Sequence, residues 1–292
     1  MSQEETYIFK RATIVGPGLL GGSIGIGLKE KNIAKEVWAT LRNQEKREQC
    51  DKTTWCDRAL LDLIESVKYS DLVILCTPVD TILEQIQIIA NVTQPECVVT
   101  DVGSLKKEIC ELADKVFINK PSYFVGSHPM AGSEKSGLEF GSLDLLKKKN
   151  CIVTPTDNSK PDCKNKVLEL WKRLGMRVKE MNHVQHDKVV SCISHLPHIV
   201  ASSLMNSMKD LSDNDLGLAG NGLKDTTRIA SGNPVLWKQI LLGNRKNLLL
   251  DLENIISDLN EVVSALKEED EESLLLMLHT AKKRRDQWYD KK

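Results

Sequence analysis

The sequence predicts an α/β protein in two parts, a doubly wound parallel sheet followed by an all-helical domain. Up to about residue 180, short apolar runs alternate with amphipathic stretches, which is typical of strands and helices in a layered α/β fold. From about residue 183 onward, apolar residues recur instead at helical spacing. We therefore expect residues 1–182 to form the sheet domain and residues 183–292 to form the helical domain.

Six short runs rich in β-branched residues predict the strands of the sheet. They cover residues 12–15, 37–39, 71–76, 97–101, 123–126 and 151–154. Polar residues do not alternate with apolar ones inside these runs, and this is typical of strands that are buried on both faces of a parallel sheet. Amphipathic segments at 81–90 and 106–113 predict helices between the strands. The strand–helix–strand order is the basis for the doubly wound fold.

Three segments of the second half, 187–208, 234–266 and 269–289, predict long helices. The stretch from 241 to 270 carries apolar residues on more than one helical face. A helix of this kind is usually buried between neighbours. We expect it to form a homodimer interface, and the alternative is the core of a monomeric helical bundle.

The composition restricts the class of protein. Hydrophobic residues make up 41% and charged residues 28% of the 292 residues, the formal net charge is -1, and no dense basic stripe occurs. We therefore expect neither nucleic acid nor an anionic membrane surface as a partner. The eight cysteines are scattered without a C-x-x-C pair, and no stretch has the length of a membrane span or the apolar core of a signal peptide. Reduced thiols and a cytoplasmic location are expected.

A glycine motif, Gly-Pro-Gly-Leu-Leu-Gly, occupies residues 16–21 between the first predicted strand and a helix. With a second strand at 37–39, this context predicts a Rossmann-like dinucleotide site. Gly16 suits a tight turn, Gly18 lets the backbone approach a pyrophosphate, and Gly21 lets the helix pack on the strand. The amides at the helix N-terminus attract phosphates. The alternative is an ordinary glycine-containing turn. The expected cofactor-binding residues of this turn are Gly16, Gly18, Leu19, Leu20 and Gly21.

The end of the second strand bears on the choice between NAD and NADP. An acid about 20 residues after the glycines would bind the ribose hydroxyls of NAD. The sequence has no acid there; Leu41 is followed by Arg42. The planar guanidinium of Arg42 can pair with the 2′-phosphate of NADP. We expect NAD(P) as cofactor with a slight preference for NADP, while use of both cofactors and a solvated Arg42 remain alternatives.

Three polar sequences follow strands of the predicted sheet and contain Thr77, Ser104 and His128. Ligands of an open parallel sheet bind outside the carboxyl ends of its strands. Pro129 disfavours helical backbone at His128, so we expect the imidazole to project from the strand end into the cleft. A neutral histidine there can accept the proton of a substrate hydroxyl that becomes a carbonyl. Ser104 is expected to hold the imidazole or the hydroxyl, and Thr77 to contact the cofactor.

Several motifs resemble those of the prephenate and arogenate dehydrogenases of tyrosine biosynthesis. They lie at residues 16–23, 101–106, 127–132, 194–198 and 225–237. They occur in the order of that family and span about residues 11 to 240. Together they are strongly specific, although each one alone is modest.

The resemblance implies roles for individual residues. By it, His128 matches the catalytic histidine of the family and Ser104 the serine that supports it. Arg228 matches an arginine that binds a substrate carboxylate. The other expected substrate-binding residues are His198, Ser133, Asp225 and Trp237. The family places its active site between the Rossmann-like domain and an all-helical dimerisation domain. Leu41 departs from many members, which carry an acid there, and this departure puts a preference for NAD in doubt.

The resemblance also implies the reaction, the oxidative decarboxylation of prephenate to 4-hydroxyphenylpyruvate with reduction of NAD(P). A close alternative is arogenate dehydrogenase, which gives tyrosine directly. More distant alternatives are a β-hydroxyacid dehydrogenase, which normally uses a catalytic lysine, and a dinucleotide sensor without catalysis. No additional mutase or regulatory segment is recognisable, so we expect the minimal, monofunctional form.

Four histidines, His183, His186, His195 and His198, lie close together in the sequence. Pro197 is expected to interrupt the helix that carries the last two. The i, i+3 spacing places His195 and His198 on one face of a helix, where two metal ligands could lie. Neither a carboxylate nor a cysteine accompanies the pair at suitable spacing, so no metal is expected.

Overall fold

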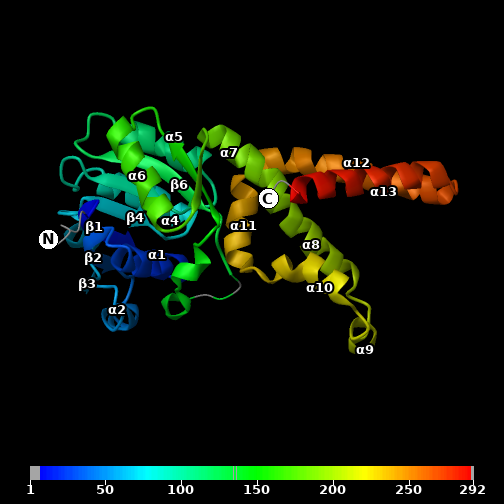
Figure 1. Cartoon of the computed structure of the whole chain (residues 1–292), viewed down its shortest axis with the longest axis horizontal. Helices are drawn as coiled ribbons and strands as arrows, with labels where there is room; N and C mark the ends of the chain where they lie inside the picture. Colours follow the sequence, from blue (N-terminus) through cyan, green and yellow to red (C-terminus); the bar gives the residue numbers. More distant parts are fainter. Residues whose placement is uncertain (1–6, 134, 136, 291–292) are drawn as a thin grey trace. The chain divides into compact units, whose positions relative to one another are not determined.

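A computed structural model describes residues 7–133, 135 and 137–290 of the chain (Figure 1). The chain forms two compact units, Met1–Asn244 and Arg245–Lys292. The first unit contains the sheet, its covering helices and a further set of helices. The second unit consists of two long helices.

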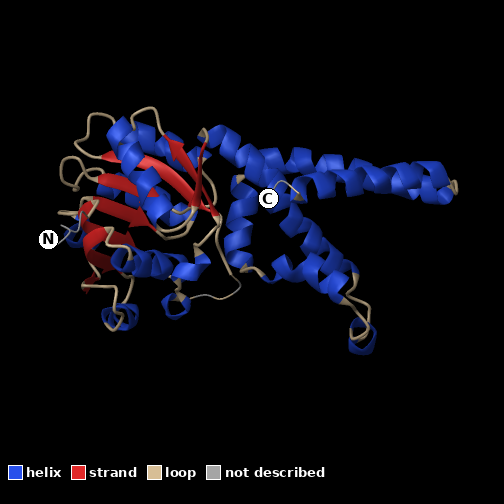
Figure 2. Cartoon of the chain, viewed as in Figure 1, coloured by secondary structure: helices blue, strands red, loops and turns tan. Residues whose placement is uncertain are grey.

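The first unit is built on an eight-stranded sheet, which confirms the predicted α/β fold class (Figure 2). The strand order is β3-β2-β1-β4-β5-β6-β7-β8. The strands are β1 (Phe9–Val15), β2 (Ala34–Thr40), β3 (Arg58–Leu60), β4 (Leu72–Leu75), β5 (Val98–Asp101), β6 (Tyr123–Pro129), β7 (Asn150–Pro155) and β8 (Arg177–Glu180). Strands β1 to β6 are mutually parallel, as the unbroken apolar runs predict.

Two strands depart from the all-parallel sheet that the sequence predicts. Strand β7 runs antiparallel to β6, with His128 opposite Ile152, and β8 runs parallel to β7. The segment between β6 and β7 holds only two single-turn 3-10 helices, Leu138–Phe140 and Leu143–Leu145, among its described residues. A parallel neighbour would need a full crossover connection, usually a helix. Without that crossover, the chain enters the sheet again at the edge where β6 leaves it, with Cys151 opposite Pro129.

Helices cover both faces of the sheet. One face is covered by α1 (Leu19–Glu30) and α6 (Pro161–Arg173), and the other by α3 (Leu63–Val67), α4 (Val79–Ile89) and α5 (Lys107–Val116). The buried strands supply alternate side chains to the two cores: Leu72 and Ile74 join the first, whereas Val73 and Leu75 join the second. The outer helix α2 (Gln44–Asp51) follows β2 and begins with a side-chain cap from Asn43.

The strand order reverses at β1, which lies between β2 and β4. After β1 the chain builds β2 and β3 on one side, and then returns to build β4, β5 and β6 on the other. Connections that diverge in this way leave a crevice outside the carboxyl ends of the strands. By this rule, a ligand-binding crevice is expected beside the glycine turn that follows β1.

The remainder of the first unit is helical. Its helices are α7 (His183–Val190), a π-helical turn (Ser191–His195), α8 (Leu196–Ser207), α9 (Asp213–Leu216), α10 (Asn221–Thr227), a 3-10 turn (Arg228–Ser231) and α11 (Pro234–Gly243). The single helix expected over 187–208 is thus divided by the π-helical turn. Pro197 lies in the first turn of α8, where its missing N–H costs little, and the wider π-helical turn precedes it.

The second unit consists of α12 (Arg245–Lys267) and α13 (Glu271–Tyr289), which contact each other. The helix expected over 234–266 is therefore two helices, α11 and α12. Many large apolar side chains of this unit are exposed in the single chain, among them Leu249, Leu250, Ile256, Leu259, Leu266, Leu275, Leu276 and Leu278. None of the helices in the described residues is both long and apolar enough to span a membrane.

Candidate active site

The glycine turn after β1 has the geometry expected of a phosphate-binding turn. Gly16 has a φ of +71°, a conformation that side chains disfavour, and its amide donates a hydrogen bond to the carbonyl of Thr40 (2.9 Å). Gly18 is the N-cap residue of α1, and a Cβ placed on it would meet no atom within 4 Å. No side chain caps this helix, so the amides of its first turn, including those of Leu19 and Leu20, are available to an anion.

Gly21 lies where α1 crosses the sheet. A Cβ on Gly21 would lie 3.1 Å from a methyl group of Ile14 and 3.3 Å from Cβ of Cys76. The helix therefore packs closely on β1 and on the end of β4, as the sequence predicts for the third glycine. The residues of this turn fit a dinucleotide, because a Cβ on Gly18 would meet no atom within 4 Å and the N-cap position of α1 makes no side-chain hydrogen bond to the amides of the first turn.

Two further predicted cofactor residues lie beside this turn. The side chain of Thr77, just after β4, is so close to Gly16 that a Cβ there would come within 2.4 Å of its Cγ2 atom. The Thr77 hydroxyl donates a hydrogen bond to Gln85 (2.7 Å). Arg42 follows β2 and is exposed, while the adjacent Leu41 is buried. The ends of β1, β2 and β4 thus bring Gly16, Thr77 and the segment of Arg42 together.

A buried polar network occupies the carboxyl ends of β5 and β6. Asp101 and Lys106 form an ion pair, and both side chains are 0% exposed. Asp101 also accepts hydrogen bonds from the amides of Gly103 (2.8 Å) and Ser127 (3.1 Å). Its carbonyl accepts from the Ser127 hydroxyl (2.6 Å). The turn between β5 and α5 is therefore fixed to β6, immediately before His128.

His128 is the penultimate residue of β6 and is only 7% exposed. Its Nδ1 lies 2.8 Å from Nε2 of His186 on α7, and Nε2 of His128 has no hydrogen-bond partner among the described residues. Burial lowers the pKa of His128 well below its ordinary value, and His186, Lys106 and His195 lower it further. The imidazole is therefore neutral at neutral pH, as a proton acceptor requires.

The sequence did not single out His186 as a functional residue, yet it makes the hydrogen bond that holds His128. Its Nδ1 lies 2.7 Å from a carboxylate oxygen of Asp187. Asp187 in turn accepts hydrogen bonds from the amides of Lys106 (2.8 Å) and Lys107 (3.1 Å) at the start of α5. Ser104, the expected support of His128, lies in the same turn, but its hydroxyl makes no hydrogen bond within the described residues. Its assignment stays a prediction.

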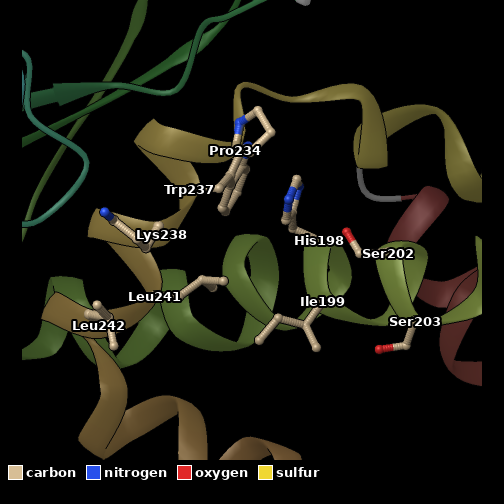
Figure 3. A pocket seen from close by; sticks show the side chains of 9 residues that line it. All are labelled: His198, Ile199, Ser202, Ser203, Pro234, Trp237, Lys238, Leu241 and Leu242. Carbon is tan, nitrogen blue, oxygen red and sulfur yellow. The ribbon is translucent and has the colours of Figure 1, made fainter. Parts of the chain in front are cut away.

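The expected substrate residues His198 and Trp237 lie together. Their rings are stacked, with centroids 3.6 Å apart and an interplanar angle of 9°. Burial lowers the pKa of His198, while a hydrogen bond to the backbone of Ile229 opposes this shift. The pair lies in a pocket of about 430 Å³ between α8 and α11. Figure 3 shows the side chains that line it. Its lining residues are His198, Ile199, Ser202, Ser203, Pro234, Trp237, Lys238, Leu241 and Leu242.

The remaining predicted substrate residues do not line this pocket. Arg228 is exposed at the start of the 3-10 turn that packs on α8. Asp225 is exposed near the end of α10. Ser133 is exposed after β6, and its hydroxyl accepts a hydrogen bond from the amide of Lys135 (3.2 Å). Residues 134 and 136 lie outside the described part.

A chain of contacts joins the pocket to His128. The ring of His195 makes an edge contact with Trp237, with the ring centroids 6.2 Å apart. Nδ1 of His195 lies 3.1 Å from the side-chain amide nitrogen of Asn244. The same amide donates to the carbonyl of Asp187 (2.7 Å). Asp187 thus contacts Asn244 through its carbonyl oxygen and His186 through its carboxylate. Within the described residues, no cluster of three or more histidine, cysteine, aspartate or glutamate side chains is arranged to hold a metal ion.

Comparisons with known proteins agree with this arrangement. The sequence model for the prephenate dehydrogenase nucleotide-binding domain matches residues 24–180, and that for the prephenate dehydrogenase dimerization domain matches residues 182–280. Prephenate dehydrogenase of Bacillus subtilis (strain 168) is 34% identical over 278 residues, which are 94% of this chain and 74% of that protein.

Solved structures give the same result. A crystal structure of prephenate dehydrogenase from A. aeolicus, in complex with hydroxyphenyl propionate and NAD+, has a TM-score of 0.86 and 29% identity, and the match covers 95% of this chain and 98% of that chain. Synechocystis arogenate dehydrogenase has a TM-score of 0.81 and 26% identity, with 95% and 99% of the two chains covered. The chain is therefore an oxidoreductase that belongs to the prephenate dehydrogenase family.

Proposed function

We propose that this protein catalyses the oxidative decarboxylation of prephenate to 4-hydroxyphenylpyruvate, with NAD(P) as the hydride acceptor. The observation that carries the proposal is the position of His128. It is a buried, neutral imidazole whose Nε2 has no hydrogen-bond partner in the described part of the chain, and it lies at the edge of the sheet that also carries the glycine turn. Three strand spacings, about 14 Å in total, separate β1 from β6, and an extended dinucleotide can span this distance.

The cofactor, when bound, supplies the hydride acceptor of the reaction. The first turn of α1 and the backbone of Gly18 hold its pyrophosphate. Arg42, which has no ion pair among the described residues, is available to a 2′-phosphate, and this supports the slight preference for NADP. The bound NAD+ in the A. aeolicus structure is a property of that enzyme and does not decide between NAD and NADP for this chain. An assay with both cofactors is therefore required.

The substrate needs a proton acceptor and cations for its carboxylates. Nε2 of His128 accepts the proton of the ring hydroxyl, assisted by Ser104. Arg228 pairs with a carboxylate, since a guanidinium can bind both oxygens at once. His198 and Trp237 form an aromatic wall, and we assign Asp225 and Ser133 to the rim of the same site. Losing carbon dioxide makes the ring aromatic, so the protein mainly positions groups and stabilises charge.

We also infer that the enzyme is a homodimer, with residues 1–182 as the dinucleotide-binding domain and 183–292 as the dimerisation and substrate domain. The match to a dimerization domain over residues 182–280 supports this. The exposed apolar side chains of α12 and α13 support it too, because extensive exposed apolar surface usually marks an interface. A cytoplasmic location is consistent with eight free cysteines. Sedimentation at working concentration tests the dimer, and a monomer would contradict it.

The deciding experiment is a rate assay of four combinations, prephenate or arogenate with NAD or NADP, followed by nicotinamide absorbance. We expect the highest kcat/KM with prephenate. Faster turnover of arogenate would make arogenate, and not prephenate, the assigned substrate, in line with the similarity to Synechocystis arogenate dehydrogenase. No turnover in any combination, with dinucleotide binding intact, would overturn the proposed reaction.

Variants test the assigned roles. Replacing Arg228 with Ala should raise KM for the substrate roughly 10- to 100-fold, because a charge-assisted contact is worth about 1.5–3 kcal/mol. His128→Asn should reduce kcat by roughly 10²–10⁴-fold and leave dinucleotide affinity intact. His183→Gln is the matched control, since it removes an imidazole at the start of α7 that makes no hydrogen bond with His128.

A further inference from the structure

His186 and Asp187 extend inward from His128 as a continuous chain of short hydrogen bonds. Nδ1 of His128 lies 2.8 Å from Nε2 of His186, and Nδ1 of His186 lies 2.7 Å from Oδ1 of Asp187. His186 is 0% exposed and Asp187 is 4% exposed. His186 and Asp187 are neighbours on α7, whereas His128 lies on β6, 58 residues away from His186, so only the fold brings His128 to the pair.

The charge state of this chain follows from its surroundings. Burial raises the pKa of Asp187, but hydrogen bonds from His186 and from the amides of Lys106 and Lys107 outweigh burial and keep the pKa below its ordinary value. Burial lowers the pKa of His186, and Asp187 only partly opposes this. At neutral pH, Asp187 is therefore ionised and both imidazoles are neutral.

With these charges, only one arrangement of protons satisfies both hydrogen bonds. A carboxylate can only accept, so Nδ1 of His186 carries a proton and donates it to Asp187. Neutral His186 then has a lone pair on Nε2, which accepts a hydrogen bond from the Nδ1 proton of His128. Neutral His128 consequently has its lone pair on Nε2, the nitrogen without a partner among the described residues.

We propose that His186 and Asp187 are positioning residues that hold His128 in the Nδ1–H tautomer, with Nε2 ready to accept the substrate's proton. The inference rests on the proposed function for the proton that Nε2 receives. When the O–H bond of the substrate breaks, its electron pair stays on oxygen and its proton goes to Nε2 of His128. Nδ1–H remains donated to His186, and Asp187 stabilises the resulting imidazolium across the His186 ring.

The backbone around α5 is arranged to keep Asp187 in place. Its two oxygens accept from consecutive amides at the start of α5, a position where a helix favours negative charge. The Asp101–Lys106 ion pair fixes the preceding turn. Among the described residues, Lys106 and His195 also lower the pKa of His128, so each disfavours a positive charge on its ring. Asp187 is therefore the anion that supports the protonated ring through His186.

The tautomer can be observed without substrate. In the full-length protein with ¹⁵N-labelled histidine, two-bond ¹⁵N–¹H correlation spectra distinguish a protonated Nδ1 from a protonated Nε2. We expect the protonated Nδ1 form for His128 at pH 7.5, with the signal assigned by its absence in His128→Asn. A protonated Nε2 on neutral His128 would overturn the proposal, whether or not the protein uses prephenate.

Kinetics of relay variants provide the second test. In Asp187→Asn, the amide NH2 can donate to His186 and reverse both tautomers, so we expect kcat to fall roughly 10²–10⁴-fold with little change in KM. His186→Gln retains an oxygen that accepts from Nδ1 of His128, whereas His186→Leu does not. The Gln variant should therefore keep at least about tenfold more activity than the Leu variant, on the scale of a lost buried hydrogen bond.

Three controls keep the outcomes distinct. His183→Gln changes a histidine of the same helix outside the relay and should retain wild-type kcat. Dinucleotide affinity and circular dichroism report whether each variant folds, and the Gln/Leu comparison remains informative if Asp187→Asn does not fold. Equal activity of the Gln and Leu variants, or wild-type kcat in Asp187→Asn, would overturn the relay. An inactive wild type would refute the proposed function and leave the tautomer test unaffected.

Discussion

The Asp101–Lys106 ion pair provides a stringent test of how the site is held together. Both side chains are 0% exposed, and Asp101 also accepts hydrogen bonds from the amides of Gly103 and Ser127. Asp101→Asn removes the negative charge but keeps the side-chain volume. It leaves the Lys106 ammonium buried without a counter-charge and places an amide NH2 where only acceptors are useful.

Breaking a buried pair by removing one partner typically costs about 3–5 kcal/mol. Whole domains are stable by only about 5–15 kcal/mol, so this is a large fraction of the total. For a unit of this size, 1 kcal/mol corresponds to about 2–4 °C in Tm, so we expect a decrease of roughly 6–20 °C. Urea unfolding followed by circular dichroism measures the free energy, and a thermal scan measures Tm.

Two comparisons make this prediction falsifiable. The double variant, with Asp101→Asn and Lys106→Met, should recover much of the loss because no unpaired charge remains. Glu65→Gln breaks the exposed pair between Arg58 and Glu65, and should cost less than about 1 kcal/mol. Two results would refute this reasoning about buried ion pairs. One is a loss of unfolding free energy below about 1 kcal/mol in Asp101→Asn, and the other is a double variant whose loss equals the sum of the two single losses.

Three further predictions concern the cofactor and pH. Gly16→Ala should weaken dinucleotide binding at least about tenfold, because the φ of Gly16 is +71° and the new Cβ would clash with Thr77. Cofactor fluorescence measures the affinity, and an unchanged affinity would contradict the assignment of this turn to the cofactor. Arg42→Gln should reduce the kcat/KM ratio of NADP to NAD at least about fivefold, and an unchanged ratio would make Arg42 a solvated residue. Because burial lowers the pKa of His128 and His186, the unfolded chain binds more protons below their ordinary value of 6.5. The free energy of unfolding should therefore fall as pH decreases from 6.5, with a shallower slope in His128→Asn, and a urea midpoint that rises on acidification would refute this sign.

The fold was predictable from sequence wherever burial imposes a pattern. Strands β1, β2, β4, β5 and β6 were predicted because strands buried on both faces are continuous apolar runs. Strand β3 was missed because its three residues are too few to leave such a run, and β8 was missed because its side chains are largely exposed. The direction of β7 was also missed. An apolar run indicates burial, but the direction of a strand depends on the connection that precedes it.

The glycine turn and His128 were predictable because each depends on local chemistry. Gly16 needs a positive φ, and His128 stands before a proline at the end of a strand. His186 was considered only as one of several clustered histidines, because its partner is 58 residues away in sequence. The adjacent His186 and Asp187 near the start of a helix were the available signal. Helical periodicity alone does not tell which turn of a helix meets a strand end.

The same network shows why the site depends on residues that touch no substrate. The side chain of Lys106 pairs with Asp101, which fixes β6 next to His128, and the main chain of Lys106 donates to Asp187. One residue therefore holds both the strand that carries His128 and the carboxylate that orients it through His186. Apolar packing alone would tolerate small shifts of α7 against the sheet, whereas hydrogen bonds of 2.7 and 2.8 Å do not. Because these groups act as a unit, we expect their substitutions to be non-additive in kcat, as they are for other coupled catalytic networks.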